Sequence, residues 1–304
     1  MLDSSVLVNG PAKPTHPCLA RCLRSRTLAK QTFGTGTKTF ENYHDLLNDS
    51  TVEAVLIALP NFLHAPVLQS AAKSKKHLFF EPPVAEDSGI ATHVLDALAA
   101  SECVVQADLE LRYLPVMDNV LACIQSGRLG EPLMAKIRLW CNWGYEGGAW
   151  YDEVQGQSFF LWLGCWYLDA LDCIFRRAAA QASVVGGRHS NGTLMDAGWA
   201  SLVYIGQLEF NLVIPQETAI ELTVACRTGE IIADLQTGQW RWRGQAGDWH
   251  LEHTPASTPA YGFVGMRESL QEFFDTIYGG DGPRANVEVM RRIQHAAQLC
   301  AEAE

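Results

Sequence analysis

The sequence predicts an α/β protein with two domains, a parallel-sheet domain followed by a domain with a mostly antiparallel, open sheet. The 304 residues are enough for two hydrophobic cores. Residues 52–80 read as strand, helix and strand, the β-α-β unit from which parallel sheets are built. Several segments after residue 133 alternate apolar and polar residues, as a sheet with one solvent-facing side should.

Composition and charge limit the classes of binding partner and the cellular compartment that we expect for this protein. The chain is 48% hydrophobic and 19% charged, and its net charge of -11 disfavours binding to nucleic acid or to an anionic membrane. No apolar run approaches the ~20 residues that span a bilayer, and residues 1–17 lack the pattern of a signal peptide. The nine cysteines form no Cys-x-x-Cys pair, so we expect reduced thiols in a cytoplasmic protein. The histidines are dispersed, and we expect no metal site.

The first forty residues are the least regular part of the chain. A dinucleotide-binding domain opens with a strand, a Gly-x-Gly-x-x-Gly turn and a helix. Residues 5–9 can form that strand and Gly10 the tight turn, whereas Ala12 and Thr15 stand where the other two glycines belong. Residues 18–23 can be either the helix or a second strand. Under both interpretations roughly ten or more residues of such a domain are missing.

The strand-helix-strand segment predicts a ligand site at one edge of its sheet. Residues 52–59 form an apolar run of strand length that ends at Pro60, and we expect Asn61 to cap the helix that follows. Residues 78–80 form the second strand, which ends at Glu81. Open α/β sheets bind ligands at the carboxyl ends of their strands. The residues expected to contact a cofactor are Gly10, Ala12, Leu59, Pro60, Asn61, His64 and Glu81.

The remaining elements follow from periodicity and turn residues. We expect helices at 40–48, 89–100, 116–126, 268–278 and 286–303. Asp87 or Ser88 can cap the second of these helices. We expect strands at 103–107, 133–142, 182–185, 199–205, 208–214, 220–226, 231–234 and 239–243.

The segment 57–83, IALPNFLHAPVLQSAAKSKKHLFFEPP, resembles the nucleotide-binding domain of the Gfo/Idh/MocA oxidoreductases. In that family one strand ends in Thr/Ala-x-Pro-Asn-x-x-His and the next in Glu-Lys-Pro. The resemblance continues through residues 105–115, 127–131, 164–169 and the last helix, and it covers roughly residues 40–304. It implies an oxidoreductase that uses NAD or NADP, with a Rossmann-like domain at 1–113 and a substrate and dimerisation domain at 114–304. It also implies a small-molecule substrate and a homodimer or homotetramer formed through the C-terminal sheet.

The residues that carry this family's proton transfer are replaced. Its members supply the lysine of Glu-Lys-Pro, an aspartate two residues before the glycine of Gly-x-His-x-x-Asp, and that histidine. The matching positions here are Pro82, Trp162 and Trp166, while Gly164 and Asp169 keep the register. A proline ring and two indoles relay no proton, because an indole N–H only donates a hydrogen bond.

The neighbouring polar residues supply the other candidates. Tyr167, Asp169 and Arg112 are the candidates for a catalytic role, with a structural hydrogen bond slightly favoured for Asp169. Glu110 and Arg112 alternate with leucines, so we expect them to share one face, either as an ion pair or lining a cleft. His64, in the first turn of its helix, can touch a nicotinamide or make a structural hydrogen bond.

Aromatic residues are concentrated before Gly164. Five of the nine tryptophans lie between residues 140 and 166, together with two tyrosines. They form either an aromatic core beside a glycine-rich loop or the wall of a pocket for a flat, conjugated or sugar-like ligand. The expected pocket residues are Pro82, Glu110, Trp162 and Trp166, and the last two, four residues apart, should share one helix face.

Three functions remain open on this sequence. One is an oxidoreductase with an altered active site, like the bilin reductases, which resemble this family, lack its Lys and His pattern and reduce a conjugated substrate. Another is a catalytically inactive relative that binds a ligand or a partner chain. The third is a structural subunit that dimerises through the second sheet.

Overall fold

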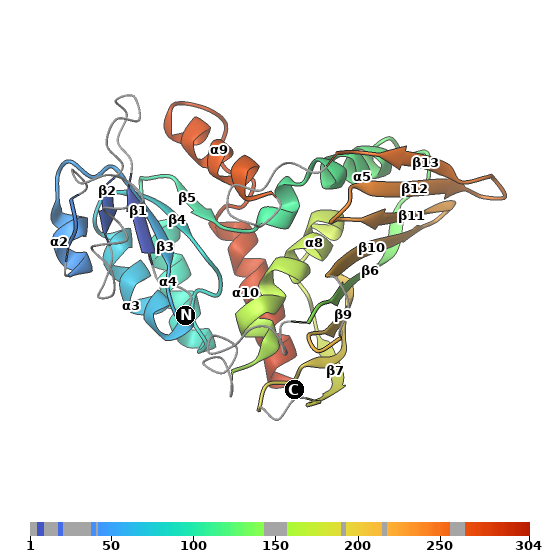
Figure 1. Cartoon of the computed structure of the whole chain (residues 1–304), viewed down its shortest axis with the longest axis horizontal. Coiled ribbons are helices and arrows are strands. Elements are labelled where there is room, and N and C mark those ends of the chain that lie inside the picture. The colour runs from blue at the N-terminus through green and yellow to red at the C-terminus, as the bar shows by residue number, and fades with distance from the viewer. Residues whose placement is uncertain are drawn as a thin grey trace. The chain divides into compact units, whose positions relative to one another are not determined.

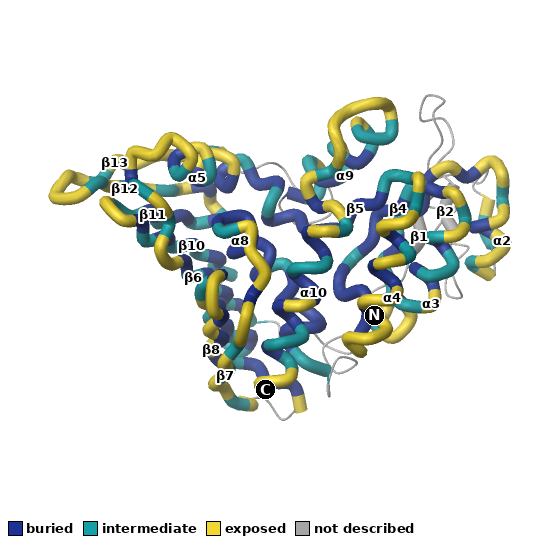
Figure 2. The backbone as a smooth tube through the Cα atoms, turned by 180° about the vertical axis from the view of Figure 1, so that it is seen from behind, coloured by how far each residue is buried: buried dark blue, intermediate teal, exposed yellow. Residues whose placement is uncertain are grey.

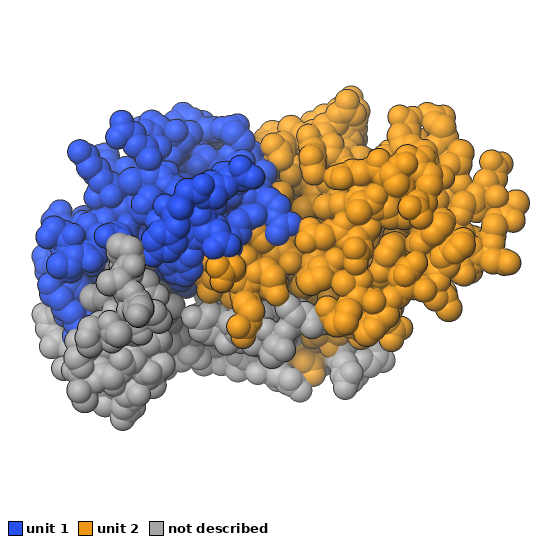
Figure 3. Space-filling model, turned by 90° about the horizontal axis from the view of Figure 1, so that it is seen from above, with its two compact units in different colours: residues 1–108, 272–291 blue, residues 109–271, 292–304 orange. Residues whose placement is uncertain are grey.

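The computed structural model describes residues 5–8, 18–20, 38–40, 42–142, 157–189, 193–214, 218–255 and 265–304. The chain divides into two compact units (Figure 3). Unit 1 contains residues 1–108 and 272–291, and unit 2 contains residues 109–271 and 292–304. Two helices, α9 (Met266–Ile277) and α10 (Val287–Glu302), contribute residues to both units.

Unit 1 is built on a five-stranded sheet in the order β2-β1-β3-β4-β5 (Figure 1). Its strands are β1 (Ser5–Val8), β2 (Cys18–Ala20), β3 (Ala54–Ala58), β4 (His77–Phe80) and β5 (Val105–Ala107). Strands β3, β4 and β5 run parallel. The predicted strand-helix-strand segment is therefore present, with α3 (Asn61–Ala72) as the connecting helix.

The start of this sheet differs from the sequence expectation. The expected opening strand lies in the sheet as β1, but it pairs antiparallel with β3, with Ser5 opposite Ala58 and Leu7 opposite Leu56. Strand β1 therefore ends at the edge where the parallel strands begin, opposite the edge at which a dinucleotide binds. Residues 18–20 form a strand antiparallel to β1 and not a helix. The expected cofactor contacts Gly10 and Ala12 lie outside the described residues.

Local capping explains where the helices of unit 1 begin. Helix α2 (Tyr43–Asn48) begins after Asn42, whose side chain accepts a hydrogen bond from the amide of His44. Helix α4 (Ser88–Ala99) is capped by Asp87, as predicted, through a 2.8 Å bond from the Ile90 amide. The prediction for Asn61 was wrong, because Pro60 occupies the N-cap of α3 and Asn61 is its first helical residue.

Unit 2 is built on an eight-stranded sheet in the order β13-β12-β11-β10-β6-β9-β8-β7 (Figure 1). Its strands are β6 (Pro132–Trp140), β7 (Ala182–Gly187), β8 (Ala197–Leu202), β9 (Gly206–Asn211), β10 (Ala219–Cys226), β11 (Gly229–Asp234), β12 (Gln239–Gly244) and β13 (His250–His253). All neighbouring strands pair antiparallel except β6 and β9. The predicted fold class is therefore confirmed.

Helices cover one face of this sheet. Helix α8 (Cys165–Phe175) packs on β6 and β9, and α5 (Pro115–Gln125) packs on β11. The central strands β6 and β10 alternate buried and less buried residues, whereas β13 at the edge is exposed (Figure 2). The other face carries cross-strand ion pairs, among them Lys136 with Glu209 and Arg138 with Glu221.

Two further properties concern the described residues as a whole. None of their helices combines the length and apolarity needed to cross a membrane. Among the described residues, free thiols are found at Cys103, Cys123, Cys141, Cys165, Cys173, Cys226 and Cys300. The described residues contain no group of three or more His, Cys, Asp or Glu side chains placed to hold a metal ion.

Candidate functional site

The carboxyl edge of the parallel strands brings together two loops of unit 1. The chain leaves β3 through Leu59 and Pro60 and leaves β4 through Glu81. The amide of Glu81 donates to Ile57 O at 3.0 Å, and the amide of Asp108 donates to Phe80 O at 2.7 Å. The backbone of all three parallel strands is therefore hydrogen-bonded up to this edge, which holds the loops in place.

His64 joins these two loops through its ring. Its Nδ1 lies 2.6 Å from Pro83 O and its Nε2 lies 2.6 Å from Leu59 O. Two carbonyl partners favour a charged ring, but burial lowers the pKa of His64 more than these bonds raise it. We take the ring as neutral, with one nitrogen donating. Both nitrogens face the backbone, so His64 positions the loops and has no nitrogen left to bond a nicotinamide.

Glu81 is a titratable group at this edge whose ionisation is altered by burial. Burial raises its pKa to about 7. The residues that follow it, 82–85, are buried, whereas Glu81 is only partly so. A carboxyl that ionises near neutral pH at the ligand edge of an α/β sheet is suited to accept or release a proton. Pro82, the next residue along the chain, carries no titratable group.

The candidate residues of unit 2 lie in a helix that starts with a wide π turn. The turn η2 spans Phe160–Gly164 and continues directly into α8. Phe159 stacks on Phe210 of β9 at 3.9 Å between ring centroids, and Phe160 meets the same ring edge-on at 5.5 Å. The Cys165 thiol donates to Phe160 O at 3.5 Å. These contacts hold the turn against the sheet, and such turns are frequent at functional sites.

Gly164 allows the π turn to pack closely. A Cβ at this position would lie 3.3 Å from Cδ1 and 3.4 Å from Cβ of Phe160, a ring already held by Phe159 and Phe210. We expect Gly164→Ala to lower the free energy of unfolding by about 1–2 kcal/mol, since crowding outweighs the helix propensity gained. Urea denaturation will measure it, with Gly89→Ala, on an exposed turn of α4, as the control. A Gly164→Ala protein as stable as wild type contradicts this packing argument.

Trp162 and Trp166 lie on this turn and on α8. Trp162 is 7% exposed and packs in the interior. Within residues 159–174, Trp166 is the one residue that is not fully buried. Its indole N–H is itself buried and has no hydrogen-bond partner in the described part of the chain.

Of the three described tryptophans in this stretch, Trp140 lies apart from Trp162 and Trp166. Trp140 lies on β6 in the same parity as Lys136 and Arg138, so it faces away from the α8 side of the sheet. It donates to Glu209 at 3.0 Å and lies under the Arg138 guanidinium. Trp143 and Trp150, with Tyr145 and Tyr151, lie outside the described residues.

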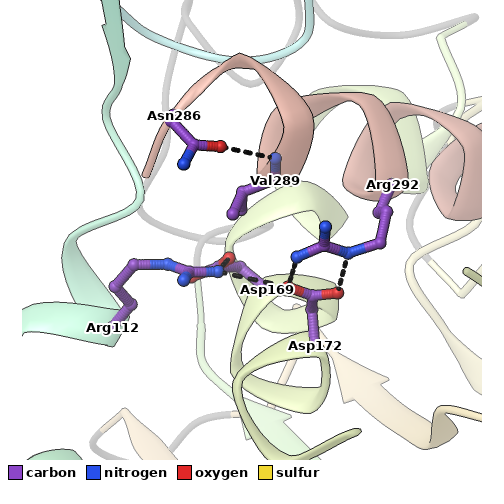
Figure 4. Close-up of polar contacts among 6 residues, drawn as sticks. All are labelled: Arg112, Asp169, Asp172, Asn286, Val289 and Arg292. Atoms are coloured by element: carbon purple, nitrogen blue, oxygen red, sulfur yellow. Dashed lines mark hydrogen bonds and ion pairs between the residues drawn. The ribbon is translucent and has the colours of Figure 1, made fainter. Parts of the chain in front are cut away.

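Arg112, Asp169 and Asp172 form a buried ionic network with Arg292 of α10 (Figure 4). Arg112, from the 3-10 helix η1 (Glu110–Tyr113), contacts both carboxylate oxygens of Asp169, with its Nε 3.2 Å from Oδ2. Its Nη2 also lies 3.4 Å from Asp172 Oδ2. Arg292 forms the second fork, at 2.7 and 2.8 Å to the two oxygens of Asp172. The network ties η1, α8 and α10 together.

The electrostatics of the network favour a structural role. Burial raises the pKa of Asp169 to about 6, and the Arg112 guanidinium opposes that rise. Burial also works against the charge on Arg112, but the carboxylate of Asp169 raises its pKa well above the ordinary value. The pair is therefore ionised at neutral pH. Burial, with Cys141 and Glu110 nearby, raises the pKa of Tyr167 well above its ordinary value, so this phenol keeps its proton.

The predicted arrangement of Glu110 and Arg112 was wrong. The prediction assumed an extended chain with alternating faces, but residues 110–113 form a 3-10 helix with about three residues per turn. Residues two apart then point in different directions. Glu110 is buried, and Arg112 is directed to the carboxylates of α8.

The comparisons with known proteins agree with this fold. Residues 20–109 match the model of an oxidoreductase family with an NAD-binding Rossmann fold, and residues 117–232 match the GFO/IDH/MocA C-terminal domain. The chain belongs to the Gfo/Idh/MocA family. In this Gfo/Idh/MocA protein, the β3-α3-β4 edge belongs to the NAD-binding match and the η2–α8 segment to the C-terminal match.

Named relatives are similar over part of their length. The chain is 34% identical over 102 residues to inositol 2-dehydrogenase of Salmonella typhimurium and 30% identical over 96 residues to an uncharacterized oxidoreductase of Bacillus subtilis. These alignments cover 33% and 32% of this chain, and 30% and 28% of the relatives.

Solved structures are similar over most of the chain. A levoglucosan dehydrogenase in complex with NADH and levoglucosan superposes with a TM-score of 0.79 at 15% identity, over 93% of this chain and 87% of that one. An Agrobacterium radiobacter oxidoreductase in complex with NAD+, L-tartaric acid and magnesium gives 0.80 at 17% identity, with the same coverage. At these identities the similarity shows the fold.

Two parts of the site escaped the sequence prediction. Asp172 and Arg292 were not singled out, although the spacing of Asp169 and Asp172 inside an apolar stretch was a signal for a buried ion network. The π turn carries no distinct sequence pattern, so its presence before Gly164 was not predicted.

Proposed function

We propose that this protein is an NAD(P)-dependent oxidoreductase with an altered active site, acting on a sugar-like, polyol or conjugated substrate. The observation that carries the proposal is the carboxyl edge of β3–β5, where the His64 ring lies between the loop at Leu59 and the loop at Pro83 and donates a hydrogen bond to one of them. Such an edge is where α/β sheets hold a dinucleotide. The residues proposed to hold it are Leu59, Pro60, Asn61 and Glu81, with His64 positioning them.

The cofactor supplies the hydride-accepting carbon when it is bound, and the protein must handle the proton. We propose Glu81 for that task. In the oxidation of an alcohol, the Glu81 carboxylate would accept the proton of the hydroxyl group, while a bound nicotinamide would supply the hydride acceptor. The other acidic candidates are less suited: Asp169 is held by Arg112, and Tyr167 keeps its proton. In this proposal Arg112 and Asp169 support the site and do not take part in the chemistry.

A second candidate function is ligand binding without catalysis. The replacement of the lysine, aspartate and histidine by Pro82, Trp162 and Trp166 is the observation that favours it. Both functions predict a bound ligand, but only the first predicts hydride transfer.

One experiment separates the two. NADH and NADPH are titrated into the protein while nicotinamide fluorescence and energy transfer from the tryptophans are recorded. Binding with a Kd below about 1 mM, a free energy beyond roughly -4 kcal/mol, is expected. Turnover is then tested with a polyol panel of myo-inositol and levoglucosan, and with a bilin as the conjugated substrate. Binding without turnover of any of these supports the inactive relative, and absence of binding by both cofactors removes the oxidoreductase proposal.

We further propose a homo-oligomer formed through the open face of the second sheet. Val185 and Trp199 face each other across β7 and β8, and they are 70% and 58% exposed. We expect the wild-type protein to elute as a dimer or tetramer and Trp199→Glu to shift it to smaller mass in light scattering. Tyr278→Glu, at an exposed residue of unit 1, is the control that should leave the mass unchanged. A wild-type monomer contradicts the proposal.

A further inference from the structure

We infer that the indole N–H of Trp166 is a substrate-binding donor, which hydrogen-bonds a hydroxyl or carbonyl oxygen of the bound substrate. The inference rests on the proposed function, since it assigns the donor to the substrate of that reaction. It differs from a general aromatic wall because it names one atom, Nε1, and one kind of partner, a neutral oxygen acceptor.

The first argument is the state of that atom. The Nε1–H of Trp166 is buried and lacks a hydrogen-bond partner in the described residues. A buried donor left without an acceptor costs about 1–3 kcal/mol. Native proteins avoid such a cost unless a water or a ligand supplies the missing acceptor. Trp166 as a whole residue is partly exposed, unlike its buried neighbours, so it lies at the boundary of the core.

The second argument is the rigidity of the segment that carries the ring. On one side, the π turn is packed on β9 through Phe159 and Phe160, and Cys165 bonds back to Phe160 O. On the other side, Asp169, three residues after Trp166, is held by both nitrogens of the Arg112 fork. A donor on a segment fixed at both ends is oriented before the ligand arrives, which lowers the entropic cost of binding.

The third argument is chemical. The position matches the family's histidine, which can both donate a hydrogen bond and transfer a proton. An indole keeps the donation and loses the transfer. Trp166 therefore suits a polyol hydroxyl or a ketone oxygen that must be held, and it leaves the proton to another group. The buried Tyr167 and Cys165 on either side have raised pKa values and keep their protons.

The test uses the full-length protein with 15N-labelled tryptophan. Trp166→Phe keeps an aromatic ring without the N–H, so the indole signal that disappears in this variant belongs to Trp166. We expect that signal, and not that of Trp249 on the far face of the sheet, to move downfield when myo-inositol or levoglucosan is added with NADH. We expect Trp166→Phe to weaken polyol binding about fivefold, the value of one neutral hydrogen bond. Trp166→His, which restores a ring N–H, should recover most of that loss.

The possible results of these experiments test the role of Trp166 separately from the proposed oxidoreductase function. If polyol binds and is turned over but the Trp166 signal stays in place and Trp166→Phe binds equally well, the inference is wrong and the oxidoreductase proposal stands. If neither NADH nor NADPH binds, the proposed function fails, and the response of the Trp166 signal to polyol alone still decides whether the N–H is a ligand donor. A signal that no member of the polyol panel moves overturns the inference.

Discussion

Replacing Arg112 by methionine is expected to cost about 3–5 kcal/mol of unfolding free energy, because it leaves the carboxylate of Asp169 buried without its partner. Methionine keeps much of the side-chain volume, so the loss reports the charge and not a cavity. Arg112 also contacts Asp172, but Asp172 retains Arg292. Urea denaturation followed by tryptophan fluorescence measures the change.

Two further variants sharpen this test. Arg227→Met removes one partner of an exposed pair with Glu131, whose side chains are 63% and 61% exposed, and should change stability by less than about 1 kcal/mol. Arg112→Met combined with Asp169→Leu removes both buried charges and should recover much of the loss, since an apolar pair can replace a buried ion pair. An Arg112→Met protein no less stable than Arg227→Met would show that the network contributes little.

Replacing Glu81 by glutamine is expected to lower kcat by about 10²–10³-fold, the usual contribution of a positioned acid-base group. The amide keeps the shape of the side chain and still forms hydrogen bonds but cannot take a proton, so the loss in kcat should exceed any change in the KM for cofactor. In the direction of alcohol oxidation the carboxylate is the active form. Because burial raises the pKa of Glu81 to about 7, the wild-type rate should rise as pH passes through that value.

The pH profile distinguishes catalysis from mere support of the fold. In Glu81→Gln the rise near pH 7 should disappear, whereas Glu86→Gln, at an exposed carboxylate of the same loop, should retain both rate and profile. The free energy of unfolding should depend on pH in the opposite direction to the rate. A folded-state pKa above the ordinary 4.5 means that the folded protein binds the proton more tightly, so this residue's contribution to stability falls as pH rises from about 4.5 to 7. An unchanged rate profile in Glu81→Gln would contradict the proposed role.

The sequence predicted the elements well where the signal was local. Residues 54–58 form a strand because the run is apolar, and Pro60 stands at the point where the next helix begins. The alternation of leucines with polar residues at 109–113 predicts an extended chain. The short 3-10 helix there has a different period and places Arg112 beside α8. The antiparallel direction of β1 could not be predicted either, because sequence periodicity indicates a strand but not its orientation in the sheet.

The sequence predicted which residues belong to the candidate site better than it predicted which of them contact one another. Arg112 and Asp169 were both singled out, but a pairing across 57 positions of sequence leaves no local trace. The position of Trp140, in contrast, could be predicted from the sequence. Its parity with Arg138 on β6 was readable from the sequence, and it separates this ring from Trp166 on the other face of the sheet. The sequence left an aromatic core and a pocket open for this cluster, and the strand geometry places Trp140 outside the expected pocket of Trp162 and Trp166.

The wide turn at Phe160–Gly164 also bears on how this chain is aligned with its relatives. A π turn holds one residue more than the same length of α-helix, so a relative without it aligns upstream of Gly164 only through a one-residue gap. Downstream the numbering is unaffected, so the proposed match of Trp166 to the family's histidine does not depend on this turn. Upstream, the aspartate falls opposite Trp162 without the gap and opposite Leu161 with it. Both side chains are apolar and buried, so neither alignment restores a carboxylate to that position.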